Sequence, residues 1–425
     1  MLAKKPQSRP ERVLSFEDAR HLVASHAHLL RSSSKQIEHV PILASLGRVL
    51  AEAIVADRDF PPFARATRDG YAVRSEDLRR PPAELTVVGE IRAGGDLPHG
   101  FSRLQNGRAL SIMTGAPVPD GADAVVMVEY TERAGQRVRV LRSVTAGENV
   151  VPRGREARRG STLVSARTVI GHAQIALAAS VGKSTVSVYS RPRIAILPTG
   201  DEIVPIDAQP AANQIRNSNS FSLAAQVTSC GGEAVQLSIA PDDRARLREL
   251  IAQGLESDLL LLSGGVSAGE YDLVEDELGK FGAEFLFTGV QIQPGKPLVF
   301  GRAQPRSNRE RWTYFFGLPG NPISTMVTFQ LFGSIFVRAL AGSAERSISG
   351  RKIRLAKDVK TKMGLTRFLP GKVSGWWDDP EVDLLSWQGS GDMAAFARAD
   401  CLLVIPPDRE SYKSGEWMTV IPIEG

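Results

Sequence analysis

The spacing of apolar residues changes several times along the chain, and each stretch predicts a different kind of structure. From Ser15, apolar residues return every three or four positions, which predicts a helix with Ser15 as its N-cap. A second, short helix is expected over residues 42–55. Residues 85–163 instead contain short alternating runs and turn pairs such as Asn106-Gly107, which predicts a mostly β insertion.

After Arg191, short apolar runs alternate with amphipathic stretches. The runs predict strands at 194–197, 234–239, 258–262, 297–300 and 312–316, and the stretches predict helices at 218–229, 242–255, 270–281 and 322–341. This alternation is typical of an open, doubly wound parallel sheet covered by helices on both faces. The last part of the chain returns to β texture and predicts a small barrel or sandwich.

We therefore predict a multi-domain α/β protein, and its 425 residues suffice for several cores. The expected parts are a helical and linker region at 12–58 and 164–190, a β-rich inserted domain at 59–163, an α/β domain at 191–345, and a C-terminal β-barrel domain at 350–425. The insertion thus loops out of the helical region.

Composition excludes several classes of protein. The two cysteines, Cys230 and Cys401, form no Cys-x-x-Cys pair, which argues against a disulfide scaffold or a zinc ribbon. Apolar runs such as 259–262 are far shorter than the roughly 20 residues of a spanning helix. We expect a cytoplasmic protein, neither secreted nor inserted in a membrane.

Positive charge is concentrated in one segment. The net charge is +5 with a pI of about 9.2, which is compatible with nucleic acid, anionic lipid or a small polyanion as partner. Residues 131–170 hold nine arginines against three glutamates, a local excess of six charges. No helix-turn-helix or aromatic-plus-basic strand motif supports nucleic-acid binding, so we expect neither nucleic acid nor membrane as partner.

Three predicted strands end in loops of small residues, at 198–202, 263–269 and 317–322. Parallel strands bring their carboxyl ends to one edge of the sheet, where ligands bind. Glycine lets the backbone approach an anion closely, and the helices that follow direct free N–H groups toward it. The three loops together predict a phosphate-bearing ligand.

Carboxylates accompany these loops, and a single lysine lies in a stiff turn. Glu202, Asp242 and Asp272 would repel a polyphosphate unless a divalent cation intervened, which indicates a magnesium-type site of oxygen ligands. The structural alternative is that Asp242 caps its helix, while Glu202 and Asp272 interact with helix dipoles. Lys296, in the turn 294–297, is available to an oxyanion or is simply solvated.

Six motifs occur in a characteristic order. They are Asp69-Gly70-Tyr71-Ala72, 113–119 with 121–126, Thr199-Gly200-Asp201-Glu202, Ser263-Gly264-Gly265-Val266-Ser267, Pro294-Gly295-Lys296-Pro297 and Leu318-Pro319-Gly320-Asn321-Pro322. In this order the chain resembles the MoeA family of molybdopterin molybdenumtransferases, which is related to the E domains of gephyrin and of the plant enzyme. The resemblance covers residues 15–425.

The resemblance implies a transferase that inserts molybdate into adenylylated molybdopterin, giving molybdenum cofactor and AMP with the help of Mg²⁺ or a similar cation. It implies catalytic roles for Asp69, Glu202, Asp242, Asp272 and Lys296, with the cation on Glu202, Asp242 and Asp272. The implied pterin-binding residues are Thr199, Gly200, Asp201, Ser263, Gly264, Gly265, Val266, Ser267, Pro294, Gly295, Pro297, Pro319, Gly320, Asn321, Pro322 and Ser324. Lys296, Ser267 and Ser324 would receive molybdate.

The resemblance also implies a homodimer in which Asp69 and the segment 153–159 complete the site of the other subunit. A solvated basic face is the alternative for those arginines. The partners would be pterin and molybdate, with transient contact to the adenylyltransferase that supplies the pterin and to molybdoenzymes.

Four places depart from the usual family pattern: Gly154-Arg155-Glu156-Ala157, Asn217-Ser218-Asn219-Ser220, Gln293 and Arg68. A non-catalytic carrier or scaffold that binds molybdopterin is therefore the alternative function. The acidic residues argue against it, because a pure binder needs no cation. An ATP-dependent adenylylating relative is disfavoured, since that class resembles only the α/β domain.

Overall fold

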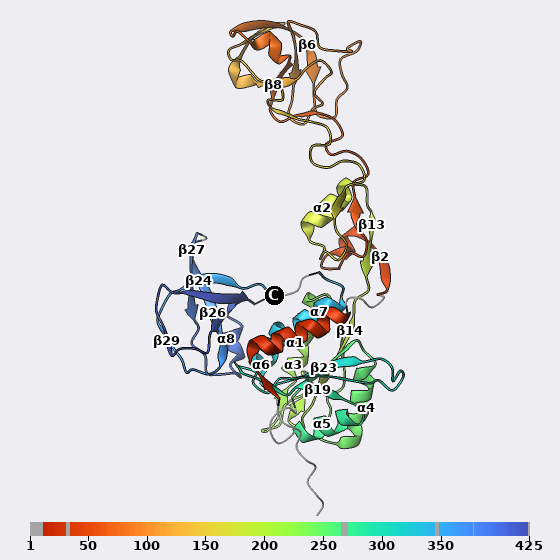
Figure 1. The fold of residues 1–425 in the computed structure, drawn as a ribbon, viewed down its shortest axis with the longest axis vertical. Helices are drawn as coiled ribbons and strands as arrows, with labels where there is room; N and C mark the ends of the chain where they lie inside the picture. Colours follow the sequence, from red (N-terminus) through yellow and green to blue (C-terminus); the bar gives the residue numbers. More distant parts are fainter. Residues whose placement is uncertain (1–11, 31–34, 265–270, 345–347, 377, 424–425) are drawn as a thin grey trace, which may run out of the picture. The chain divides into compact units, whose positions relative to one another are not determined.

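The computed structural model describes residues 12–30, 35–264, 271–344, 348–376 and 378–423 (Figure 1). The chain divides into two compact units. The main unit comprises Met1–Ala51, Arg167–Gly171 and Thr185–Gly425, and the insert unit comprises Glu52–Ala166 and His172–Ser184.

A six-stranded sheet is the centre of the main unit. Its order is β17 (Glu233–Gln236), β14 (Arg193–Pro198), β18 (Leu259–Ser263), β23 (Thr313–Leu318), β22 (Val299–Ala303) and β19 (Glu284–Phe287). The first four strands are parallel, as predicted, but β22 runs antiparallel to both of its neighbours, β23 and β19, so β19 has the direction of the first four strands. Residues 304–312 join β22 to β23 without a helix, and so short a connection cannot return the chain in parallel.

Helices cover both faces of this sheet. One face carries α1 (Phe16–Leu29), α3 (Ser218–Ser229), α6 (Pro322–Thr328) and α7 (Ser334–Leu340), and the other carries α4 (Arg244–Leu255) and α5 (Tyr271–Gly279) (Figure 1). Successive strand residues point to opposite faces, so Ile194 and Ile196 enter the first core while Ala195 and Leu197 enter the second. The doubly wound architecture is confirmed.

The helix that follows β23 is long and strongly apolar. The segments α6 and α7 are joined by a π-helical turn at Phe329–Gly333. Pro322–Leu340 is apolar enough by length and composition to cross a membrane, yet 83% of its apolar window is buried inside the fold. Its composition is therefore explained by its place in the core.

The helix predicted over 42–55 is wrong. A single 3₁₀ turn, η2 (Ile42–Ser45), is followed by Gly47 at φ +73° and later by the short strand β3 (Ile54–Val55). The backbone N–H groups of Leu50 and Ala51 donate to carbonyls at Thr168 and Ser187, outside this stretch of sequence. Long-range pairing thus replaces the local helix. Nearby, β2 (Ile37–Pro41) pairs with β13 (Thr185–Tyr189).

The insert unit is mostly β, as predicted. Its sheet has the order β8 (Ala124–Met127), β5 (Gly70–Val73), β7 (Arg108–Ile112), β6 (Ala83–Ile91), β10 (Arg137–Val140) and β9 (Thr131–Ala134). Buried valines such as Val73, Val126 and Val138 fill its core. The short pairs β3 with β12 (Thr162–Val164) and β4 (Arg65–Ala66) with β11 (Val150–Val151), and the helix α2 (His172–Ser180), also belong to this unit.

The C-terminal strands close into a barrel, the first of the two predicted alternatives. Its members are β26 (Thr366–Trp376), β27 (Asp379–Leu384), β24 (Arg351–Leu355), β30 (Trp417–Pro422) and β28 (Cys401–Ile405). Because β26 pairs with both β27 and β28, the five strands form a ring. The interior is apolar, with Leu355, Val382 and Leu403 fully buried.

Candidate functional site

The three small-residue loops meet at one edge of the central sheet. In the parallel register, Pro198 lies opposite Ser263, and Ser263 lies opposite Leu318. The N–H of Thr199 donates to the carbonyl of Ser263 over 3.0 Å, and that of Gly264 donates to Leu318 over 3.4 Å. The prediction that these strand ends converge is confirmed.

Two glycines of these loops lie against each other but differ in their freedom. Gly264 has φ +94°, and a β-carbon there would lie 2.5 Å from the carbonyl oxygen of Thr199. At Gly320 a β-carbon would fit, because its nearest neighbour would be Cα of Gly264 at 3.6 Å. Glycine is thus required at 264 for the loops to pack, whereas at 320 the lack of a side chain leaves open space.

A small pocket of about 320 Å³ lies over these loops. Gly264, Gly320 and Asn321 line it from the strand ends, and Asn219 lines it from the first turn of α3. Of the predicted pterin-binding residues, Pro297, Pro319 and Pro322 also line it. The loop glycines and the beginning of a helix therefore face one cavity, which suits an anionic group.

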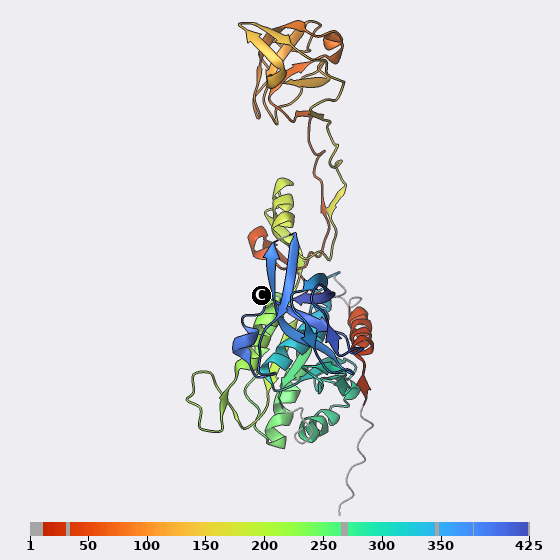
Figure 2. The same ribbon diagram turned by 90° about the vertical axis from the view of Figure 1, so that its left-hand side faces the viewer.

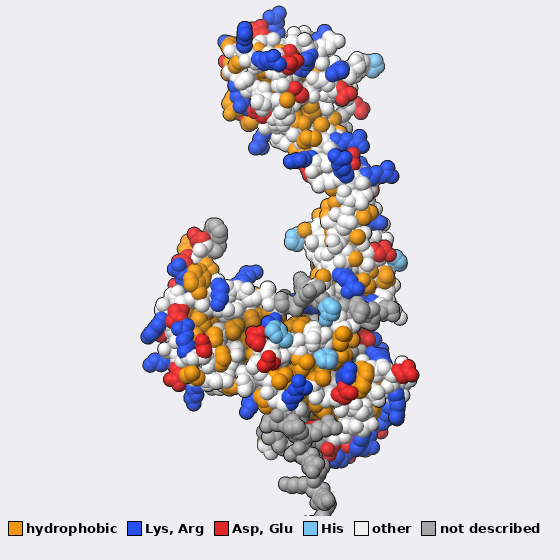
Figure 3. Space-filling view, viewed as in Figure 1, with side chains coloured by type: hydrophobic (Ala, Val, Ile, Leu, Met, Phe, Trp, Pro, Cys, Tyr) orange, Lys and Arg blue, Asp and Glu red, His pale blue; other side chains and the backbone are white. Residues whose placement is uncertain are grey.

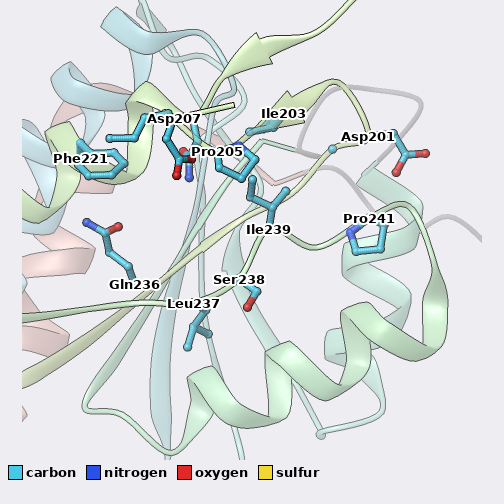
Figure 4. Close-up of a pocket in the computed structure, with 13 residues that line it drawn as sticks. Asp201, Ile203, Pro205, Asp207, Phe221, Gln236, Leu237, Ser238, Ile239 and Pro241 are labelled. Atoms are coloured by element: carbon cyan, nitrogen blue, oxygen red, sulfur yellow. The ribbon is translucent and has the colours of Figure 1, made fainter. Parts of the chain in front are cut away.

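A larger pocket of about 860 Å³ lies beside the loop that connects β15 (Ile203–Val204) and β16 (Ile215–Arg216). This connecting loop projects from the main unit (Figure 2). In Figure 4, Phe221 and Asp207 lie toward one end of the pocket and Asp201 and Pro241 toward the other. Ile203 lines both pockets, so the base of the loop separates them.

Three carboxylates gather next to the first loop. The N–H of Asp242 donates to Oδ1 of Asp201 over 3.1 Å, and the Glu202 carboxylate folds over Gly200. Burial raises the pKa of Asp242, and the negative charges of Asp201 and Glu202 raise it further. The three carboxylates therefore repel one another where they lie.

Asp242 is not the cap of its helix. Asp243 holds that place, because its side chain accepts the N–H of Arg246 over 2.8 Å. The structural alternative for Asp242 is therefore wrong. Within the described residues, no three His, Cys, Asp or Glu side chains are placed to ligate one metal ion. The side chain of Asp272, in α5, lies outside the described part, so the metal site stays a prediction.

The remaining predicted residues have different settings. Gly265, Val266 and Ser267 lie outside the described residues. Lys296 is exposed in its turn, next to Pro294 and Gly295, which are buried. Ser324 is 4% exposed within α6 and does not line the small pocket. The side chain of Gln293 accepts a hydrogen bond from Arg367 of the barrel over 2.8 Å, which gives this family departure a structural partner.

Asp69, in the insert unit, lies immediately before β5, and two hydrogen bonds hold its side chain. The hydroxyl and the backbone N–H of Thr114 both donate to the Asp69 carboxylate over 2.7 Å. These two bonds, the hydroxyl's more than the N–H's, keep the pKa of Asp69 below its ordinary value.

Figure 3 shows Lys and Arg side chains gathered on the insert unit. Arg153 pairs with Asp59 at 2.9 Å, and Glu156, another family departure, pairs with Arg65 at 2.8 Å.

Sequence reasoning missed the part played by Asn219. Its Nδ2 donates to Oγ of Ser263 over 3.0 Å and to the carbonyl of Gly320 over 2.8 Å, so it touches both glycine loops. The run 217–220 stands out for its departures from the family pattern at Asn217 and Ser220, whereas Asn219 agrees with that pattern and no role is predicted for it. Within that run, Asn217 still caps α3 by accepting the N–H of Ser220.

Three family models match consecutive parts of the chain. Residues 14–182 match the MoeA N-terminal region (domain I and II), residues 195–339 match a probable molybdopterin binding domain, and residues 352–423 match the MoeA C-terminal region (domain IV). Together these models cover most of the sequence and follow the order expected from the motifs.

Relatives that match most of the chain point to the same family. A molybdopterin molybdenumtransferase of Nostoc sp. is 37% identical over 74% of this chain and 71% of its own length. Molybdopterin molybdenumtransferase 1 of Mycobacterium tuberculosis is 31% identical over 90% of this chain and 93% of its own. A crystal structure of a molybdopterin biosynthesis MoeA protein from Pyrococcus horikoshii OT3 has a TM-score of 0.75 at 27% identity, covering 97% of this chain and all of that one. The chain therefore belongs to the MoeA family of molybdopterin molybdenumtransferases.

Proposed function

We propose that this protein is a molybdopterin molybdenumtransferase, which inserts molybdate into adenylylated molybdopterin and releases AMP in molybdenum cofactor biosynthesis. The observation that carries the proposal is the convergence of three strand ends, where Gly264 and Gly320 adjoin over one pocket. The relatives that match most of the chain bear this activity in their names.

The residues around the small pocket suit the phosphate of the pterin. The first turn of α3 brings the positive end of a helix to this pocket, and no side chain at Gly320 obstructs the approach of phosphate oxygens. Cleavage of a phosphoanhydride spreads negative charge over oxygen atoms, so positioned donors lower its barrier. Lys296, with Ser267 and Ser324, would receive molybdate. The dithiolene sulfurs that bind molybdenum belong to the pterin, which agrees with a chain of only two cysteines.

We propose a magnesium ion at the carboxylates of the first loop and of α5. Glu202, Asp242 and Asp272 would hold it, with Asp201 next to them. Their oxygens are the ligands that Mg²⁺ prefers. The pKa of Asp242 is raised first by burial and then by the negative charges of Asp201 and Glu202, and a cation would offset that charge. When bound, the ion would stabilise negative charge on the phosphate oxygens.

We further propose a cytoplasmic homodimer with the four-part division given above, in which Asp69 and the segment 153–159 complete the site of the partner subunit. Transient contacts with the adenylyltransferase and with molybdoenzymes would deliver substrate and product. The carrier alternative is not favoured, because a carrier has no use for the carboxylates around Asp242.

The test is Asp272→Asn. This variant should abolish molybdate-dependent AMP release while binding of adenylylated molybdopterin persists. Asp276→Asn is a matched control on the same helix, because Asp276 is half exposed and pairs with Arg244 on the surface. Normal turnover by Asp272→Asn would refute the cation assignment. A wild-type protein that binds the pterin without releasing AMP would support the carrier function instead.

A further inference from the structure

Asn219 connects parts of the site that are far apart in sequence. It lies in the first turn of α3, and its Nδ2 reaches Ser263 at the end of β18 and Gly320 after β23. A carbonyl oxygen can only accept a hydrogen bond, so the contact with Gly320 fixes which end of the amide faces the loops. The orientation of this side chain is thereby determined.

These contacts link all three loops in one chain of hydrogen bonds. Ser263 is fully buried, and its carbonyl accepts the N–H of Thr199 from the first loop. Its hydroxyl accepts Asn219, which in turn holds the carbonyl of Gly320 in the third loop. The side-chain amide of Asn219 thus adds a link between the loops to the backbone hydrogen bonds of Thr199 with Ser263 and of Gly264 with Leu318.

The same amide carries a feature that stability alone does not explain. Oδ1 of Asn219 is buried and has no hydrogen-bond partner among the residues that the structure describes. The same is true of the hydroxyls of Thr199, in the first loop, and of Ser220, the next residue of α3. Buried polar atoms are nearly always paired, and exceptions often mark functional sites. Asn219 itself is 9% exposed and lines the small pocket.

We propose that Asn219 is a positioning residue, which holds the glycine loops at the spacing that the phosphate of the ligand requires. This inference rests on the proposed function only for the identity of the ligand. Its structural part, that the amide of Asn219 sets the spacing of the loops at Ser263 and Gly320, stands on the hydrogen bonds alone.

The test uses Asn219→Asp, which keeps the size of the side chain but loses both donated N–H bonds and places a carboxylate against the carbonyl of Gly320. Ser222→Ala is the matched control, because the Ser222 hydroxyl donates only within α3, to the carbonyl of Asn219. Hydrogen exchange at the amides of Gly264 and Gly320, measured without ligand, should accelerate about tenfold in Asn219→Asp and stay unchanged in the control.

Kinetics provide the second readout. In Asn219→Asp the KM for adenylylated molybdopterin should rise about tenfold while kcat changes less than threefold, since the loops bind the phosphate and the reacting groups stay in place. A purely structural role would lower Tm and leave the KM and the loop exchange rates unchanged, and that result would overturn the inference. If Asn219→Asp does not fold, Ser263→Ala removes one of the two bonds and should accelerate exchange at Gly264.

The two proposals can fail separately. If the wild-type protein releases no AMP, the proposed function fails, while the exchange rates still decide the role of Asn219. If AMP release is normal and exchange is unchanged in both Asn219→Asp and Ser263→Ala, the role of Asn219 fails alone.

Discussion

Substituting alanine at two adjoining glycines separates packing from ligand binding. At Gly264, a β-carbon would lie 2.5 Å from the carbonyl oxygen of Thr199, and the backbone has φ +94°. A residue with a β-carbon pays about 1–2 kcal/mol for left-handed backbone, and a clash with fixed backbone adds about 1–3 kcal/mol. At about 2–4 °C per kcal/mol for a domain of this size, Gly264→Ala should lower Tm by about 4–20 °C.

Gly320→Ala should behave differently. Its β-carbon would meet Gly264 at 3.6 Å, an ordinary van der Waals contact, so Tm should change by less than about 2 °C. The added methyl group enters the small pocket, however, and should weaken binding of adenylylated molybdopterin at least about tenfold. Differential scanning calorimetry and a binding titration on both variants measure the two effects.

Two results would refute this reasoning. If Gly264→Ala melts with the wild-type protein, the loops do not pack as described. If Gly320→Ala binds the pterin normally, the ligand does not occupy the pocket over these glycines.

Three further predictions concern charge. Because the pKa of Asp242 is raised in the folded protein, ionisation of this carboxyl opposes folding. Without a cation, stability therefore falls as pH rises from the unfolded pKa of Asp242 through its folded pKa. MgCl₂ should raise Tm more at pH 7 than at pH 4, and Asp201→Asn should reduce that difference. The double variant Arg155→Ala with Arg158→Ala should raise several-fold the molybdate concentration needed for half-maximal AMP release, and the salt dependence of that concentration should weaken. If molybdate affinity is unchanged, these arginines form only a solvated basic face. Glu277→Gln should lower Tm with kcat unchanged, because this fully buried carboxylate is paired with Arg248 of α4 and with Lys280, just after α5. A Tm equal to that of the wild-type protein would contradict this prediction.

Local signals explain which elements could be predicted. The helix expected over 218–229 coincides with α3, because Asn217 caps it and Gly231-Gly232 stops it. The helix expected over 42–55 failed because backbone groups there pair with residues more than a hundred positions away. The reversed direction of β22, which overlaps the strand expected at 297–300, could not be predicted, because an apolar run does not reveal its direction.

The same distinction applies to the site. The three loops could be expected at one edge, since parallel strands ending in small residues must place them there. The role of Asn219 could not, because its bonds span 44 and 101 residues and depend on the rotation of α3 against the sheet. Likewise, nothing in the sequence distinguished Asp242 from Asp243 as the helix cap.

The packing of α1 against α7 has a consequence for synthesis of the chain. Ala19, Val23 and Ala27 of α1 are buried in a core that includes α7, although about 300 residues separate the two helices. At about 5–20 residues per second, α1 leaves the ribosome roughly 15–60 s before its partner. The insert unit is synthesised in this interval and can fold on the nascent chain. The apolar side of α1 stays exposed until α7 has been synthesised. Chaperone demand during translation should therefore fall on the first helix of the protein rather than on its insertion.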